Sequence, residues 1–180
     1  MDSAFGPSSA GGHAISRIAG IDPGTLHMGY GLVDDTGGEP ALVTLGVLTV
    51  KARQPLGERL HTLYQELLAL LDRYSPSEVA VEEPFVGMNP RAALAVGQAQ
   101  GVALMAAASL GVPVARYAPA AVKQAVTGYG RASKDQVQQA LGMLLKFDIA
   151  SAPEDATDAL AVALCHLQAR RVAALPVVGP

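Results

Sequence analysis

The sequence predicts an α/β fold in which helices cover both faces of a mixed sheet. Three short β-type segments joined by tight turns open the chain, and the hydrophobic period then becomes helical. Two more short strands alternate with helices in the rest of the chain. The chain has 180 residues, of which 50% are hydrophobic and 16% charged. It is therefore long and apolar enough for one domain with a sizeable core, and disorder is excluded.

The first three strands are predicted to form an antiparallel meander. Ser16–Asp22 is mostly apolar and ends at a Pro-Gly turn, residues 28–34 follow at once, and residues 42–50 are rich in Val, Leu and Thr. The sequence DTGG separates the second segment from the third. Short connections of this kind join neighbouring antiparallel strands.

The middle of the chain changes from strand to helix and back. Residues 55–74 carry leucines at helical spacing, which predicts a helix with one apolar face. Residues 78–82 form a short Val- and Ala-containing run between Ser75-Pro76 and Pro84, which predicts a strand.

The second half is predicted to alternate helices with one more strand. Asn89-Pro90 is a favourable helix start, and Ser133 with Gln136 has the spacing of a capping box. The predicted elements are a helix at 89–110, a strand at 112–117 and helices at 119–126, 133–145 and 155–171.

The composition of the termini predicts where the folded domain begins and ends, and the single cysteine indicates the redox environment. Residues 1–14 are rich in Gly, Ser and Ala without a positive start or an apolar centre, so we expect a flexible leader rather than a secretory signal. The folded domain is predicted at 15–172 and a tail at 173–180. Cys165 excludes an internal disulfide, fits a reducing cytoplasm and is expected to be a buried, inert thiol. His61 and His166 fall within helices and are expected to be satisfied surface or core residues.

Residues 92–115 contain no charged side chain, and the segment is long enough to cross a bilayer. Two glutamines, a proline, three glycines and many weakly hydrophobic alanines make insertion unfavourable. We therefore expect a core or dimer helix and no membrane span.

The charge is unevenly distributed. The net charge of −3 argues mildly against a nucleic-acid binder. However, residues 116–146 carry five basic side chains and one acidic one, whereas residues 1–115 carry six basic and eleven acidic ones. The basic segment is either a surface that meets a polyanion or a solvated helical surface, and charge alone does not choose between them.

Four acids stand where elements begin or end. Asp22 and Glu82 each end a predicted strand, and Asp155 and Asp158 share a face at the start of the last helix. If the four converge, their repulsion requires divalent cations or raised pKa values, and hard oxygen ligands suit Mg²⁺ or Mn²⁺. The alternative is that each acid only caps or ends its own element.

Several motifs occur together in one order. They are IAGIDPGTLHMGYGLV, AVEEPFVGMN, RAALAVGQAQGVA, VKQAVTGYGRASKDQVQ and EDATDALAVALCH. Together they closely resemble the RuvC family of bacterial Holliday-junction resolvases over residues 16–170. The resemblance implies a ribonuclease H-like fold with a mixed five-stranded sheet. It also implies a homodimer that makes paired symmetric nicks in four-way junction DNA during recombination and repair, alongside a RuvAB branch-migration complex.

The resemblance also assigns residues to roles. The acids that match the family's catalytic and metal-binding positions are Asp22, Glu82, Asp155 and Asp158, although some members have a histidine at the position of Asp155. They are expected to hold two Mg²⁺ ions, with Mn²⁺ as the alternative. The residues expected to bind DNA are Phe85, Lys123, Arg131 and Lys134. Phe85 either disturbs base stacking or folds onto its own core, and Tyr129 either contacts DNA or fills its loop.

Two other functions remain open at this stage. One is a scaffold that binds four-way junctions without cutting them. The other is an actin-like nucleotide phosphotransferase, whose phosphate loop also places Asp and Gly after a first strand. A phosphotransferase of that kind encloses ATP between two such domains, and this chain supplies one.

Overall fold

The computed structural model describes residues 15–83 and 90–174. The five-stranded sheet has the order β3-β2-β1-β4-β5. Its strands are β1 (Ser16–Asp22), β2 (His27–Asp35), β3 (Ala41–Thr49), β4 (Glu78–Glu82) and β5 (Val114–Tyr117). The helices are α1 (Leu56–Tyr74), α2 (Pro90–Ser109), α3 (Pro119–Thr127), α4 (Lys134–Leu145) and α5 (Glu154–Ala173). Each predicted element is confirmed to within two residues, whereas the short 3₁₀ helix at Ile149–Ser151 was not predicted.

The sheet topology brings two strand ends together. β1, β2 and β3 are antiparallel neighbours, as the meander predicts, whereas β4 and β5 run parallel to β1. Ile21 lies beside Val81 in the parallel pair. Asp22 and Glu82, the next residue on each strand, therefore end at the same edge of the sheet.

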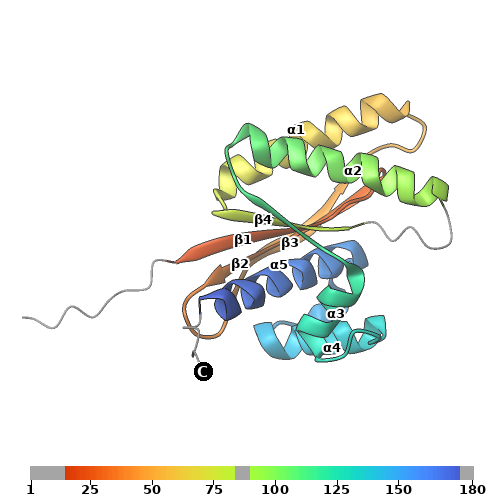
Figure 1. Cartoon of the computed structure of the whole chain (residues 1–180). Helices are drawn as coiled ribbons and strands as arrows, with labels where there is room; N and C mark the ends of the chain where they lie inside the picture. Colours follow the sequence, from red (N-terminus) through yellow and green to blue (C-terminus); the bar gives the residue numbers. More distant parts are fainter. Residues whose placement is uncertain (1–14, 84–89, 175–180) are drawn as a thin grey trace, which may run out of the picture.

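Helices cover both faces of the sheet (Figure 1), which confirms the predicted layers. Strand alternation sends Ala19, Ile21 and Val79 into a core with α1 and α2. Ile18 and Ala80 point to the other face, where α5 lies directly on the sheet and α3 and α4 pack beyond it. Asp22 lies four residues after Ile18 on β1, and Glu82 lies two residues after Ala80 on β4. Both side chains are therefore on the face of the sheet that α5 covers.

Glycines let α5 lie unusually close to the sheet. A Cβ atom on Gly20 would lie 2.0 Å from the carbonyl oxygen of Ala159, and one on Gly29 would lie 1.9 Å from that of Asp155. Both distances are far below van der Waals contact, so only glycine fits at these positions. This close approach brings the first turn of α5 down to the edge where β1 ends.

The uncharged segment forms α2, which packs against α1. Among residues 15–83 and 90–174, α2 is the one helix long and apolar enough to cross a membrane by length and composition. A core helix passes the same test, and 33% of its most apolar window is buried within the molecule. Its inner side contributes Ala99, Ala103 and Ala107 to the core, which fits the predicted core or dimer helix.

Candidate active site

Three of the predicted acids meet at the end of the sheet that faces α5. Asp22 and Glu82 come from the adjacent ends of β1 and β4, and Asp158 comes from the second turn of α5. A cleft of about 270 Å³ opens beside them. Its lining residues are Glu82, Pro119, Val122, Lys123, Lys134, Val137, Asp158 and Ala161.

The acids interact strongly enough to change their protonation. The pKa of Asp22 is raised to about 7. Burial is the largest cause, and repulsion from Glu82, Asp158 and Asp155 adds to it. A hydrogen bond with the Glu82 carboxyl contributes in the same direction. The other three predicted acids therefore all act on Asp22 through space, although they are up to 136 residues from it in the sequence.

Basic side chains partly offset this repulsion. Burial and the charge of Asp158 raise the pKa of Glu82, while a hydrogen bond with Asp22 and the charges of Lys134 and Lys123 act in the opposite direction. Burial also raises the pKa of Asp158, and Lys134 opposes it. The Lys134 ammonium lies 3.4 Å from Asp158 Oδ2. The cleft is thus an acidic site with cationic side chains at its wall.

The donor set is that of a hard divalent cation. Four carboxylates supply only oxygen ligands, and burial with mutual repulsion makes a bound cation favourable. Within the described ranges, no three His, Cys, Asp or Glu side chains already converge closely enough to ligate one ion. Asp22 and Glu82 are nevertheless hydrogen-bonded to each other, and the charge of Asp158 acts on both. The residues present therefore fit Mg²⁺ or Mn²⁺.

The five basic residues of 116–146 have different surroundings. Lys134 pairs with Glu154 as well as Asp158, Arg116 with Glu83, and Lys146 with Glu39. Lys123 lines the cleft and Arg131 is exposed; neither makes an ion pair with another described residue. Phe85 lies outside the described residues. The basic segment therefore leaves Lys123 and Arg131 available for an anionic ligand.

The turn between α3 and α4 is held by the side chains of Gln124 and Thr127, and Thr127 Oγ1 accepts a hydrogen bond from Tyr129 N at 3.1 Å. Gln124 accepts a hydrogen bond from Gly130 N at 2.9 Å and donates one to Gly128 O at 2.8 Å. Tyr129, between these glycines, is 57% exposed. The predicted capping box of Ser133 and Gln136 then starts α4. The result is a fixed turn that presents Tyr129 and Arg131 to solvent.

Two contacts of the site were not foreseen. Gln100 of α2 is 9% exposed, and its amide donates a hydrogen bond to the carbonyl oxygen of Glu82 at 3.1 Å. Glu154 holds the Lys134 ammonium at the cleft wall and raises the pKa of that lysine. Gln100 lies within the GQAQG motif and Glu154 within EDATD. Each motif therefore included the residue, but the sequence did not indicate what that residue would contact.

Comparison with known proteins places the chain and its fold in a family. A sequence model described as Crossover junction endodeoxyribonuclease RuvC matches residues 18–166. The chain belongs to the RuvC family. A RuvC from Chloroflexus aggregans is 51% identical over 83% of this chain and 92% of its own length. A RuvC from Xanthobacter autotrophicus is 49% identical over 88% of this chain and 93% of its own length.

A solved structure agrees with the sequence relatives. The structure of Thermus thermophilus RuvC with a Holliday junction substrate is 38% identical, with a TM-score of 0.82, and the match covers 88% of this chain and 96% of that one. The predicted RuvC resemblance and ribonuclease H-like fold are therefore confirmed. RuvC proteins are metal-dependent nucleases, in agreement with the oxygen donors at the cleft.

Proposed function

We propose that this protein is a crossover junction endodeoxyribonuclease that resolves Holliday junctions in homologous recombination and DNA repair. It cuts two strands symmetrically and leaves 5′-phosphate and 3′-hydroxyl ends. Membership of the RuvC family carries this proposal. The convergence of acids from β1, β4 and α5 beside a cleft with lysines at its wall supports it. We assign the activity to residues 15–172, with 1–14 and 173–180 as tails.

The carboxylates of Asp22, Glu82, Asp155 and Asp158 are proposed to hold two Mg²⁺ ions, with Mn²⁺ as a substitute. The mutual repulsion that raises the pKa of Asp22 supports this assignment, because bound cations relieve it. When bound, such ions supply Lewis-acid stabilisation of the charge that develops on the phosphate. The charge of Asp155 raises the pKa of both Asp22 and Asp158, which supports its place in the set.

Basic side chains next to the acids are proposed to hold the DNA backbone. Lys123 and Lys134 line the same cleft as Glu82, so a phosphate bound there meets both charge types. Arg131 extends this surface along the fixed turn before α4. Phe85 is proposed to stack on bases near the centre of the junction, and its position three residues after Glu82 supports this role.

We propose that two copies associate through α2. The surface between α1 and α2 holds an apolar groove of about 470 Å³ whose lining includes Leu60, Tyr64 and Met105. Met105 and Leu94 are 60% and 66% exposed. An apolar helix of small residues favours close approach of a second copy, and a two-fold dimer suits the two equivalent strands of a junction.

We place the enzyme in the cytoplasm, working with a RuvAB complex.

A cleavage assay on a synthetic four-way junction tests the function. With millimolar Mg²⁺ or Mn²⁺ we expect symmetric nicks, and each acid-to-amide variant (D22N, E82Q, D155N and D158N) should lower the rate at unchanged junction affinity. Binding without nicks in the wild-type protein would favour a junction scaffold. ATP hydrolysis without nicks would favour a phosphotransferase. A linear duplex of the same sequence serves as the control and should stay intact.

A further inference from the structure

A buried polar chain links α5 to two strands of the sheet. His166, which is 6% exposed, places Nδ1 2.7 Å from the Tyr117 hydroxyl and Nε2 2.7 Å from Glu78 Oε2. A carboxylate only accepts, so Nε2 donates its proton to Glu78, while Nδ1 is hydrogen-bonded to the Tyr117 hydroxyl. Both ring nitrogens are thus satisfied, and one side chain of α5 is bonded to β4 and β5 together.

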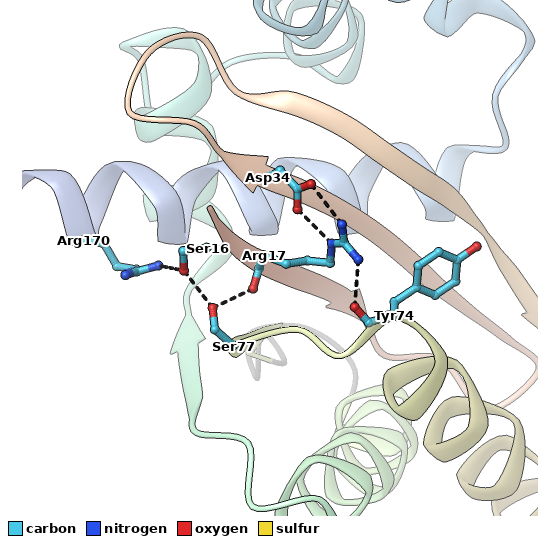
Figure 2. Close-up of polar contacts among 6 residues, drawn as sticks. All are labelled: Ser16, Arg17, Asp34, Tyr74, Ser77 and Arg170. Carbon is cyan, nitrogen blue, oxygen red and sulfur yellow. Dashed lines mark hydrogen bonds and ion pairs between the residues drawn. The ribbon is translucent and has the colours of Figure 1, made fainter. Parts of the chain in front are cut away.

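The next turn of α5 continues the same attachment. Arg170 Nε lies 3.0 Å from Glu78 Oε1, and its Nη1 donates to Ser16 Oγ at 2.6 Å. Figure 2 shows Arg170 reaching Ser16, which in turn contacts Ser77 at the start of β4. The polar contacts of α5 with the sheet thus reach the starts of β1 and β4, at the opposite end from Asp22 and Glu82.

The spacing along the two elements explains why this distant attachment matters at the cleft. His166 and Asp158 are eight residues apart on α5, which corresponds to about 12 Å along a helix. Glu78 and Glu82 are four residues apart on the same face of β4, which corresponds to about 13 Å along a strand. The two lengths agree, so an α5 held with His166 on Glu78 has Asp158 alongside Glu82. Both acids do line one cleft.

Beyond Arg170, Arg171 adds one more directional contact, to Asp35 at the end of β2. The stretch of α5 between His166 and the cleft meets the sheet in a different way. Between the two ends, α5 meets the sheet through Ala159 and Ala163 against Gly20, and through Leu160 against Gly31. Such small apolar contacts determine how close the helix lies, but they are not directional. Directional bonds are needed to fix how far the helix is displaced along the strands.

We propose that His166 is a positioning residue: through Glu78 and Tyr117 it sets the register of α5 on β4 and so holds Asp158 beside Glu82. The inference rests on the proposed function, because it concerns the geometry of the metal-binding acids. It assigns an active-site role to a side chain that touches neither substrate nor metal.

The test compares His166→Ala with Leu167→Ala in the full chain. Leu167 is the adjacent residue, is 1% exposed and packs in the core without joining the polar chain. Both variants should lower the melting temperature. The midpoint of the Mn²⁺-induced rise in melting temperature, measured with the metal alone, should increase at least about tenfold in His166→Ala and change less than about twofold in Leu167→Ala. On the junction, kcat of His166→Ala should fall about a hundredfold with KM nearly unchanged.

A conservative variant separates geometry from charge. Glu78→Gln keeps an acceptor for the histidine N–H, so its metal midpoint should stay within about threefold of wild type. Glu78→Leu removes the acceptor of both His166 and Arg170, so its midpoint should increase at least as much as that of His166→Ala. If His166→Ala does not fold, the comparison of Glu78→Gln with Glu78→Leu still tests the proposal. Equal midpoints in His166→Ala and Leu167→Ala, or in the two Glu78 variants, would overturn the positioning role alone. A wild-type protein without cleavage or metal response would overturn the proposed function instead.

Discussion

Replacing Gly29 by alanine should disable the site by lifting the start of α5 off the sheet. The added Cβ would lie 1.9 Å from the carbonyl oxygen of Asp155, whereas ordinary contact begins near 3.4 Å. The two elements must therefore separate by about 1.5 Å, because the Cβ is fixed to the backbone of β2 and the oxygen it meets belongs to the backbone of α5. Overpacking of this kind costs about 1–3 kcal/mol of stability. A displacement of about 1 Å at reacting groups costs about a hundredfold in rate.

The assay is cleavage of a four-way junction, run together with thermal unfolding. We expect kcat of Gly29→Ala to fall at least about a hundredfold while the protein stays folded at the assay temperature. Gly57→Ala is the matched control, because Gly57 is an exposed helical residue with no atom within 4 Å of an added Cβ. It should be as stable as wild type or up to about 1 kcal/mol more stable, with full activity. Wild-type kcat in Gly29→Ala would refute the argument that close helix–sheet contact sets the site.

Three further perturbations address the charges and contacts of the site. The pKa of Asp22 is raised from 3.8 to about 7 in the folded protein, so the ionised acid destabilises the fold. The free energy of unfolding of the metal-free protein should therefore fall by about 4 kcal/mol as pH rises from about 4 to about 7. Urea unfolding should show a flatter profile in Asp22→Asn, and equal profiles would contradict this. Lys123→Ala should reduce the slope of log affinity against log salt by about 1 on a junction, and an unchanged slope would remove its phosphate contact. Gln100→Leu leaves the Glu82 carbonyl without its donor, so it should lower stability by about 1–3 kcal/mol and reduce kcat without weakening junction binding; unchanged kcat would show that the contact does not affect the site.

Local pattern predicted the elements well because each is determined by its own residues. The leucine spacing of α1, the Pro-Gly turn after β1 and the capping box of Ser133 all act within one or two turns of chain. The acids were found by a weaker rule, their position at element ends, and their convergence needed the family resemblance as well. Phe85 stays a prediction, because it lies outside the described residues.

Contacts between distant segments were beyond local pattern. His166 was expected to be a satisfied residue, and it is, but its partner Glu78 lies 88 residues earlier in the chain. Gln100 sits in an apolar helix, where the sequence gives no sign that its amide reaches the carbonyl of Glu82. Such pairings depend on how α2 and α5 lie on the sheet, and this arrangement follows from the whole core rather than from either segment.

The net charge of −3 was a poor predictor of DNA binding, because it too ignores how residues are arranged in space. Charge acts on a ligand over about 8–10 Å at physiological salt, so the local arrangement decides binding and the total does not. Here Lys134 and Lys146 are already paired with acids, while Lys123 lines the cleft and Arg131 is exposed before α4. The carboxylates that make the total negative are partly those that repel one another at the site, so cations bound there would reverse the local sign. A protein that is acidic overall can thus present a surface attractive to DNA where its acids are neutralised and its basic side chains are unpaired.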